Sequence, residues 1–447
     1  MKYNFDILII GGGLVGASLA CALRASPLRI GVIEAVPLAA STQPSYDDRT
    51  LALAWGSKKI FEGMGVWNGL APEATPIERI HISDRGHFGV TRLSATEAGL
   101  PALGYVVANR ALGVVLLKTM QASKNIEWLC PAEMQEIRLR PESATVTINY
   151  VPSPFTGEGQ DGGERHQKLM TSHPHPNPPP SRGRESDSHS RKSMNKTLTA
   201  RLVIAADGAH SAVRAALGIE ADRTEYCQSA VVTTVTAGEP HGNTAYERFT
   251  DTGPLALLPL RKNECAVVWS AKEAEVPTIL GWSDAEFLNH LQDRFGDRLG
   301  SFTRPGKRAA YPLALTRVKE HVRERLALIG NAAHTVHPVA GQGFNLGLRD
   351  VASIAEILTD AVRAGEDIGG LAVLHRYADW RQRDNRITAG FTNGLIRVFS
   401  NNAFPLTFLR NAGLLAVDLM PGVKRGFVRV TSGLSGRLPR LARGLPL

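Results

Sequence analysis

The sequence predicts an α/β protein with a doubly wound domain, a second domain built on an antiparallel sheet, and a C-terminal helical region. Three observations support this prediction. Phe5 to Ile10 form a strand pattern that leads through a glycine-rich turn into an Ala-rich helix. Segments between Ser229 and Tyr311 alternate apolar and polar residues, as antiparallel strands do. A second strand, turn and helix then appear from Leu328 to Asp350, so we expect the antiparallel domain to be inserted into the first one.

The composition is that of a globular, enzyme-sized protein of two or three domains. The chain has 447 residues, of which 43% are hydrophobic. Its formal net charge is +9, but basic residues concentrate only near the C-terminus, so we expect no nucleic-acid partner. The four cysteines are widely spaced and match no metal-ligand pattern, which favours a reducing cytoplasm and no metal site. No secretory leader and no apolar run of membrane-spanning length is recognisable, so we expect a soluble or peripheral protein.

The N-terminal strand, turn and helix have the pattern of a dinucleotide-binding unit. The turn contains Gly11, Gly13 and Gly16, and a second strand, Arg29 to Ile33, ends in Glu34. In such units the three glycines make the turn, admit the pyrophosphate and let the helix pack closely, and the acid accepts a hydrogen bond from a ribose. An acidic residue here favours FAD or NAD over a 2′-phosphorylated cofactor. The alternative is a tight turn without a ligand.

Two arginines follow this unit at predicted helix starts. Arg49 precedes a predicted helix that runs to about Met64, and Arg110 opens another, Ala111 to Gln121. Either arginine could neutralise a phosphate, and Arg49 could approach a flavin ring, but each could equally be a solvated surface charge. Between them, Ile77 to Leu93 alternate around an Arg-Gly turn and predict a hairpin.

The middle of the chain contains a predicted disordered insertion at residues 151–197. Pro, Gly, Ser, His and charged residues dominate it, so it could not bury enough apolar surface to fold. Strands are predicted on both sides, at Thr145 to Tyr150 and from Leu198 onward. The second strand ends at Asp207, which precedes a glycine and a helix and is suitably placed to hold a ribose or a phosphate-bound water, although a plain turn is the alternative.

The predicted antiparallel domain follows. Its expected strands are Ser229 to Val235, Thr244 to Phe249, Leu255 to Pro259 and Ala266 to Ser270. Ser283 to Phe295 have the apolar spacing of an amphipathic helix.

The stretch from Leu328 to Asp350 returns to the first domain. After a short strand come a Gly330-Asn331 turn, His337-Pro338, and a bend with Gly341 and Gly343 before a helix. Glycines at a helix start expose backbone N–H groups and the positive helix end, which suits an anion or an electron-rich ring. An ordinary strand-turn-helix connection is the alternative interpretation.

The C-terminal region from Arg397 onward holds eight Lys and Arg residues and one Asp, interleaved with Phe and Leu. Two interpretations remain open. This region could lie on an anionic bilayer, or it could be a helix pair packed on the body with a solvated tail.

Together the motifs resemble the single-component FAD aromatic hydroxylases of the p-hydroxybenzoate hydroxylase fold. The resembling motifs are Gly11 to Gly16, Asp207-Gly208 with Ser211 and Arg214, and Gly330 to His334 with His337-Pro338 and Gly341 to Asn345. Within that superfamily the chain is most similar to the ubiquinone-biosynthesis hydroxylases, particularly the methoxyphenol branch. The supporting stretches are Asp48 to Leu53, Ile82 to His87, Glu247 to Thr250, Gly253 to Ala256 and Gly306 to Leu315.

The resemblance implies an FAD-dependent monooxygenase with NAD(P)H as a transient electron donor. Reduced flavin would capture O₂ as a C4a-hydroperoxide and transfer one oxygen atom to the ring of a polyprenylated phenol, 2-polyprenyl-6-methoxyphenol. Implied partners are this substrate, O₂ and other ubiquinone-biosynthesis proteins, with peripheral contact to the inner face of the cytoplasmic membrane. The alternatives are a sister hydroxylase acting at another ring position, a prenyl-group reductase, and a non-catalytic flavoprotein subunit.

The motifs and the resemblance together assign the site residues. Arg49, His337 and Pro338 are expected to serve catalysis. The residues expected to bind FAD are Gly11, Gly13, Gly16, Glu34, Arg49, Arg110, Asp207, Gly330, Asn331, Gly341, Gln342, Gly343 and Asn345. Most of the superfamily has Asp where this chain has Asn331, which keeps a hydrogen bond but removes a charge. The methoxyphenol branch tends to have Asn there.

The same considerations divide the chain into four parts. The FAD-binding domain is predicted to comprise residues 1–75, 101–150, 198–219 and 321–365, and the substrate domain residues 76–100 and 220–320. The insertion covers residues 151–197, and the C-terminal helical and basic region covers residues 366–447.

Overall fold

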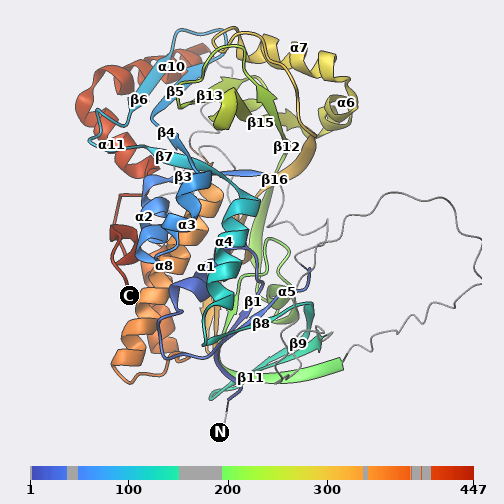
Figure 1. Cartoon of the computed structure of the whole chain (residues 1–447), viewed down its shortest axis with the longest axis vertical. Helices are drawn as coiled ribbons and strands as arrows, with labels where there is room; N and C mark the ends of the chain where they lie inside the picture. The colour runs from blue at the N-terminus through green and yellow to red at the C-terminus, as the bar shows by residue number, and fades with distance from the viewer. Residues whose placement is uncertain are drawn as a thin grey trace, which may run out of the picture.

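The computed structural model describes residues 3–37, 49–150, 194–335, 341–382 and 404–447, together with Asp384 and Gly394. Two large sheets and one small sheet make up the fold, with the second large sheet at the opposite end of the molecule from the N-terminus (Figure 1). The mixed α/β class predicted from the sequence is confirmed.

The first sheet is the predicted doubly wound unit. Its strands, in spatial order, are β17 (Val322–Arg323), β18 (Leu326–Leu328), β11 (Met194–Ala205), β1 (Phe5–Ile10), β2 (Ile30–Ile33) and β8 (Ile126–Leu129). All of these neighbours pair in parallel except β17 with β18. The strands β9 (Ala132–Leu139) and β10 (Ala144–Tyr150) continue from β11 in antiparallel pairing.

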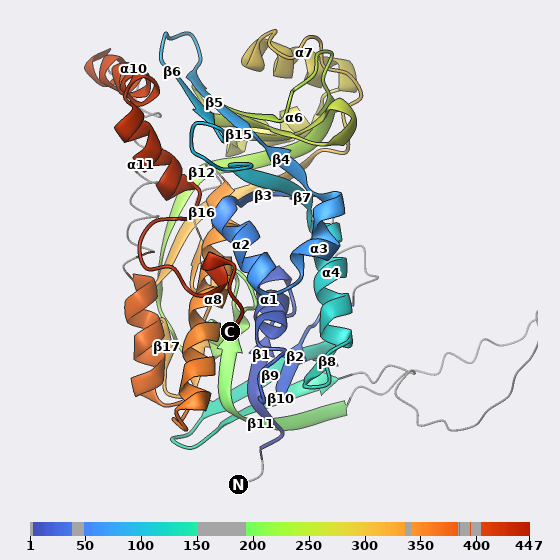
Figure 2. The ribbon, with the colours of Figure 1, turned by 60° about the vertical axis from the view of Figure 1, so that its left-hand side comes forward.

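Both faces of β1 are buried, which explains its almost uninterrupted apolar sequence. Ile7 and Ile9 belong to the core on the helical side, whereas Leu8 and Ile10 belong to the core on the β9–β10 side. Successive strand side chains point to opposite faces, so one strand supplies both cores. The parallel part of the first sheet thus lies between the helices and the β9–β10 hairpin, which belongs to the same sheet (Figure 2).

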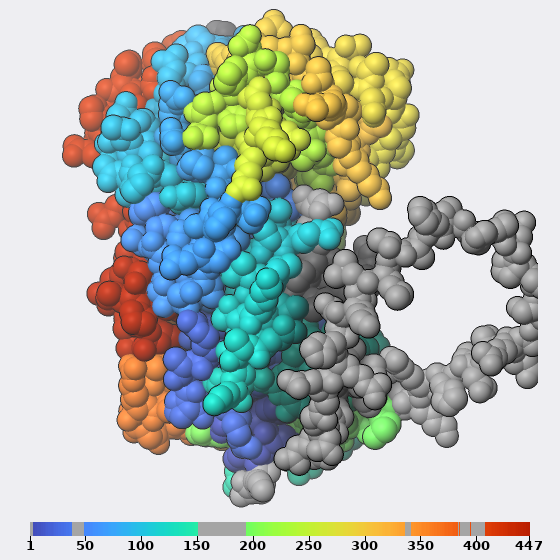
Figure 3. Space-filling model, viewed as in Figure 1, coloured from blue at the N-terminus to red at the C-terminus, as the bar shows by residue number. Residues whose placement is uncertain are grey.

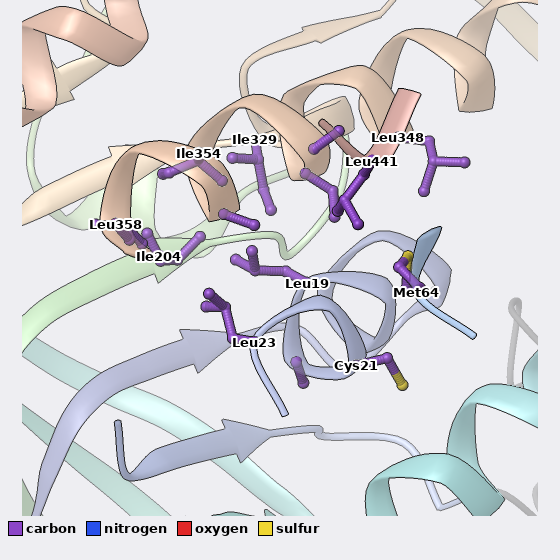
Figure 4. Packing of buried hydrophobic residues seen from close by; sticks show 14 of the residues in the cluster. Leu19, Cys21, Leu23, Met64, Ile204, Ile329, Leu348, Ile354, Leu358 and Leu441 are labelled. Atoms are coloured by element: carbon purple, nitrogen blue, oxygen red, sulfur yellow. The ribbon is translucent and has the colours of Figure 1, made fainter. Parts of the chain in front are cut away.

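Several helices lie beside the first sheet. Among them are α1 (Leu14–Ala22), α2 (Trp55–Gly63), α3 (Trp67–Leu70), α4 (Asn109–Gln121) and α8 (Gln342–Arg363). The helical residues 371–382 also pack there, and the Tyr377 hydroxyl donates to the carbonyl oxygen of Leu328 in β18. Leu19 of α1 and Leu23, the residue that caps its C-terminal end, lie beside Ile204 of β11 and residues of α8 in the core close-up (Figure 4). The long helix α8, far from α1 in sequence, is therefore packed directly against it.

The second sheet is mainly antiparallel, as predicted. Its order is β19 (His334–Thr335), β16 (Ala309–Val318), β12 (Ala221–Thr236), β15 (Glu264–Lys272), β14 (Gly253–Pro259), β13 (Thr244–Thr250), β5 (Arg79–Asp84) and β6 (Val90–Ser94). Only β13 and β5 pair in parallel among the described strands of this sheet. The predicted hairpin is β5–β6, and the predicted amphipathic helix is α7 (Asp284–Phe295), capped by Ser283 and Glu286.

A small sheet between the two large ones corrects one prediction. Thr50–Ala54 were predicted to begin a helix, but they form β3, which pairs with β7 (Gly104–Ala108), itself paired with β4 (Thr75–Ile77). Helix α2 begins only at Trp55. The local sequence Leu-Ala-Leu-Ala favours a helix, so long-range pairing with β7 outweighs local propensity here.

The insertion is shorter than predicted. Met194–Thr197, within the predicted range 151–197, form the start of β11 and pair with β10, because the antiparallel ladder continues from Thr147 opposite Thr197 to Tyr150 opposite Met194. Residues 151–193 lie outside the described part of the chain. The other domain boundaries remain predictions, although β19 joins the second sheet from within the range assigned to the FAD-binding domain.

The C-terminal region contributes helices α10 (Phe404–Leu419) and α11 (Pro421–Thr431) and the short turn η6 (Leu441–Arg443). Helix α10 lies beside β6, and η6 packs against α2 (Figure 1). Among the described helices, none is both long and apolar enough to span a membrane.

Core packing between α1 and α8 predicts a stability effect. Leu19 is fully buried, so Leu19→Ala should lower the free energy of unfolding by about 2–5 kcal/mol through lost burial and a residual cavity. Urea denaturation followed by circular dichroism measures this change. Leu371→Ala, at a side chain 40% exposed, is the control and should cost less than about 1 kcal/mol. Equal effects of the two substitutions would contradict the packing described here.

Candidate functional site

Three motifs that are distant in sequence converge around the N-terminal end of α1. Gly11 has φ +102°, and a Cβ there would lie 2.5 Å from the carbonyl oxygen of Ala206, next to Asp207. A Cβ on Gly330 would lie 3.0 Å from Val15 in the first turn of α1. The parallel strands β1, β11 and β18 all end at this edge, which is where doubly wound folds bind ligands.

The glycine turn and Glu34 have the geometry predicted for a dinucleotide unit. A Cβ on Gly16 would lie 1.9 Å from the Gly11 carbonyl oxygen, so only glycine lets α1 pack this closely on the turn. Gly13 is the N-cap of α1, and no described side chain caps that helix. The Glu34 carboxylate accepts hydrogen bonds from Gly12 N–H at 2.8 Å and Val36 N–H at 2.9 Å. The turn and the acid are therefore held together beside a bare helix N-terminus.

Asp207 lies just after the end of β11, and only one of its two carboxylate oxygens accepts a hydrogen bond from the described residues. Oδ2 accepts a hydrogen bond from Val213 N–H at 3.1 Å. Oδ1 is buried and has no hydrogen-bond partner among the described atoms. A buried carboxylate oxygen without a donor is costly unless a ligand supplies one. Nearby, Arg214 donates to the carbonyls of Ala332 and Ala209, which ties this motif to the turn after β18.

The turn at Gly330 is anchored from behind by a buried carboxylate. Asp350 of α8 is 1% exposed, and its Oδ2 accepts the Gly330 N–H at 2.9 Å. His334 Nε2 lies 2.7 Å from the same oxygen, and Arg381 Nε lies 2.6 Å from Oδ1. Arg381 also pairs with Asp384. The backbone of the turn, with Gly330 at φ +58°, is thus fixed by an interior charge network.

The charge network also sets the ionisation of Asp350. Burial by itself would raise the pKa of this carboxyl, but the charges of His334 and Arg381 and the hydrogen bonds hold the pKa below its ordinary value. Asp350 is therefore ionised at neutral pH. A buried charge with several partners is rigidly placed, which suits a residue that positions a cofactor-binding turn.

The N-terminus of α8 is braced by Asn345. Its Oδ1 accepts from Ala54 N–H at 2.9 Å and Ser57 Oγ at 2.6 Å, and its Nδ2 donates to the carbonyls of Ala52 and Gly341. These four bonds occupy every donor and acceptor of the side chain, so the predicted contact between Asn345 and the cofactor would have to come from its backbone. The brace instead fixes Gly341, the N-cap at φ +62°, against β3.

The remaining predicted residues fall into four groups. Gly343 faces open space and Gln342 is buried, so the α8 bend offers backbone rather than extended side chains. Asn331 and Arg110 are exposed. The Arg49 guanidinium lies over the Tyr311 ring, with 4.5 Å between Cζ and the ring centroid. His337 and Pro338, predicted to serve catalysis, lie outside the described residues.

The structure adds residues that sequence analysis missed. A Cβ on Gly12 would lie 2.4 Å from the Trp128 ring, so this indole lies directly on the glycine turn. Asp350 and Arg381 were also missed. In the sequence, a tryptophan in a strand and an acid inside a helix look like ordinary structural residues. The one signal of the buried Asp350–Arg381 pair was the position of Asp350 within the apolar periodicity of α8.

Together these features fit a dinucleotide with a ring-bearing end. The glycine turn and the uncapped N-terminus of α1 are suited to binding the pyrophosphate, and Glu34 is suited to binding a ribose. The Asp207 oxygen without a partner among the described atoms could accept a hydrogen bond from a hydroxyl group or a bound water. The bend at Gly341, farther along the same site, presents a second helix N-terminus.

Removing the charge of Asp350 should destabilise the protein. Asp350→Asn leaves the Arg381 guanidinium buried without this counter-charge, so we expect a loss on the order of 3–5 kcal/mol in the free energy of unfolding. Asp360→Asn, on the exposed side of the same helix, should cost less than about 1 kcal/mol. Urea titration of both variants tests this. An unchanged midpoint for Asp350→Asn would show that the network does not hold the turn.

Comparisons with known proteins agree with this geometry. Residues 182–383 match a family model described as FAD binding domain. The chain is 36% identical to ubiquinone hydroxylase UbiL of Rhodospirillum rubrum over 99% of this chain and 93% of that protein. It is 31% identical to 3-demethoxyubiquinol 3-hydroxylase of Escherichia coli over 96% of this chain and 98% of that protein.

The fold comparison points the same way. The structure resembles p-nitrophenol 4-monooxygenase PnpA from Pseudomonas putida with a TM-score of 0.73 and 18% identity, covering 98% of this chain and 100% of that chain. The predicted p-hydroxybenzoate hydroxylase fold and the FAD cofactor are therefore confirmed, and enzymes of this kind use NAD(P)H as the reductant. The chain belongs to the family of FAD-dependent ubiquinone-biosynthesis hydroxylases.

Proposed function

We propose that this monooxygenase hydroxylates the aromatic ring of a polyprenylated phenol, 2-polyprenyl-6-methoxyphenol, with NAD(P)H and O₂. The observation that supports it best is the position of the α8 bend, where the two domains meet. Asn345 joins the bend to β3, and Arg49, just before β3, lies over Tyr311 of the second sheet. A ring bound at this junction would have the FAD-binding sheet on one side and the predicted substrate domain on the other.

The proposed FAD site has two ends. Gly11, Gly13, Gly16, Glu34 and Asp207 would hold the adenosine and pyrophosphate portions, from the cradle that they form around α1. The other end would involve the turn and the bend after β18, with Arg49 and Arg110 alongside. The residues proposed for this second end are Gly330, Asn331, Gly341, Gln342 and Gly343. For catalysis, His337 and Pro338 remain predictions from the sequence.

The chain's own contribution to the reaction is positioning and electrostatics. FAD, when bound, carries electrons from NAD(P)H to O₂ and supplies the activated oxygen. The N-terminus of α8 directs backbone N–H groups and a partial positive charge toward the bend, which would stabilise negative charge on a reduced ring. Arg49 adds a full positive charge at the domain junction. The substrate domain would exclude water from the reacting ring.

The solubility of the proposed substrate indicates where in the cell the enzyme would work. A polyprenyl chain dissolves in lipid rather than in water. We therefore propose that the enzyme works at the inner face of the cytoplasmic membrane, together with other proteins of ubiquinone biosynthesis.

A second candidate is hydroxylation at another ring position. The Escherichia coli relative is named for 3-hydroxylation of demethoxyubiquinol, and it covers nearly the whole chain. A flavoprotein subunit without catalytic activity is a third alternative, which would bind FAD but show no substrate-stimulated NAD(P)H oxidation.

Product analysis tests the proposed function. The FAD-loaded protein, incubated with 2-polyprenyl-6-methoxyphenol, NADPH and O₂, should yield a product heavier by one oxygen atom, with one aromatic proton lost in the NMR spectrum. An equivalent product from a demethoxyquinol, and none from the methoxyphenol, would favour the second candidate. NADPH oxidation that no quinone precursor stimulates would contradict both.

The unused oxygen of Asp207 predicts a specific binding defect. Asp207→Ala should weaken FAD binding by about ten-fold or more, because a hydrogen bond to a charged group is worth about 1.5–3 kcal/mol. Flavin fluorescence titration of the apoprotein measures this. Asp222→Ala, an exposed acid on β12, is the control and should leave FAD affinity unchanged. Normal affinity in Asp207→Ala would show that this carboxylate does not contact the cofactor.

A further inference from the structure

Helix α10 buries polar side chains and exposes apolar ones, which is the reverse of an ordinary surface helix. Its polar residues Arg410 and Asn411 are 7% and 0% exposed, whereas Leu409 and Leu419 are 63% and 68% exposed. Surface helices of globular proteins normally bury the apolar stripe and expose the polar one. In α10 this arrangement is reversed.

The orientation of α10 is fixed by specific polar contacts with the β5–β6 hairpin. Arg410 Nε lies 2.8 Å from Asp84 Oδ2, and Asn411 Nδ2 donates to the same oxygen at 2.9 Å. Asn411 Oδ1 accepts from Gly89 N–H at 2.9 Å, so this one side chain bridges both ends of the hairpin turn. Farther along the helix, Asp418 Oδ1 accepts from Arg92 N–H at 2.7 Å. The helix cannot rotate its apolar residues inward without breaking these bonds.

The outward side forms one apolar surface with the hairpin turn and the start of α11. Phe88 of the turn packs edge-on against Phe408, with 6.3 Å between ring centroids. We call this surface the α10 apolar face. It consists of side chains that are each at least 40% exposed, namely Phe88, Phe408, Leu409, Leu415, Leu419, Met420 and Val423. Helices α10 and α11 form an outer edge of the molecule beside β6 (Figures 1 and 2), and the C-terminal residues are at the periphery in the space-filling view (Figure 3).

The basic residues of α10 and α11 differ in whether they have acidic partners. Arg410 pairs with Asp84, and Lys424 pairs with Glu97 and with Asp418, whose carboxylate also accepts the Arg92 N–H. Arg425 and Arg429 on α11 are exposed and donate only to backbone carbonyls among the described residues. An exposed apolar face with adjacent unneutralised arginines matches an anionic lipid surface, where apolar side chains enter the acyl boundary and arginines meet headgroups.

We propose that the α10 apolar face docks the protein on an anionic lipid bilayer. The proposal deepens the proposed function, because a polyprenylated substrate would be drawn from that bilayer. Its structural basis is nevertheless separate: the reversed helix, its polar anchors and the adjacent arginines. The hairpin β5–β6 belongs to the second sheet, so docking here would place the proposed substrate domain at the membrane.

Vesicle flotation of the full-length, FAD-loaded protein tests the proposal without any substrate. We expect wild-type protein to float with vesicles of phosphatidylcholine and phosphatidylglycerol, and to bind pure phosphatidylcholine at least about ten-fold more weakly. The double variant Leu409→Glu/Leu419→Glu should reduce binding to anionic vesicles at least about ten-fold, since it puts two charges into the docking face. Leu280→Glu/Leu371→Glu, at exposed leucines on other elements, should bind like wild type.

A second pair of substitutions guards against misfolding. Arg425→Glu/Arg429→Glu leaves the apolar residues intact and should also weaken binding to anionic vesicles about ten-fold, with unchanged flavin content. Wild-type protein that does not float, or docking-face variants that float normally, would overturn the proposal. Concentration-dependent dimerisation without flotation, abolished by Leu409→Glu/Leu419→Glu, would overturn it in favour of a second copy as the occupant. Failure of the hydroxylation assay would leave the flotation result unaffected, so the two proposals are separable.

Discussion

The buried carboxylate of Asp350 is the interaction on which the Gly330 turn, one end of the proposed FAD site, depends. It connects the turn after β18, strand β19 through His334, helix α8 and the helical residues 371–382 through Arg381. A charge in the interior is tolerated only while its partners surround it, so these four elements must come together in one arrangement. That requirement gives the Gly330 turn a defined position without any covalent link. The brace at Asn345 does the same for the other end of the site.

The architecture explains how distant motifs can form one site. Strands β1, β11 and β18 are parallel neighbours, so the segments that follow them meet at one edge. Helix α8 then runs past this edge, and a Cβ on its Gly347 would lie 3.2 Å from the Cα of Gly330. Packing as close as this requires small residues on both elements. The two ends of the proposed FAD site are therefore parts of one packed structure.

Local patterns were sufficient to predict the parts of the fold that are locally determined. The glycine turn after β1, the β5–β6 hairpin and the capped helix α7 all have signals within a few residues. Strands β3 and β9 lacked such signals, since β3 depends on pairing with β7, a partner distant in sequence. The Asn345 brace and the reversed α10 could not be predicted either. In both cases an asparagine side chain hydrogen-bonds to an element distant in sequence, and the sequence alone does not show that the two elements lie close together.

The length of β11 has a consequence for how the chain tolerates extra sequence. Its first residue, Met194, pairs with Tyr150, and its last, Ala205, precedes the cofactor edge. Twelve residues of extended strand separate these ends by roughly 36 Å. Residues 151–193 therefore join the fold at the end of β11 that is distant from the proposed FAD site. A fluorescent domain or affinity tag grafted at the β10–β11 connection would be separated from the proposed FAD site by the length of this strand, which makes the connection a suitable attachment point for tracking the enzyme.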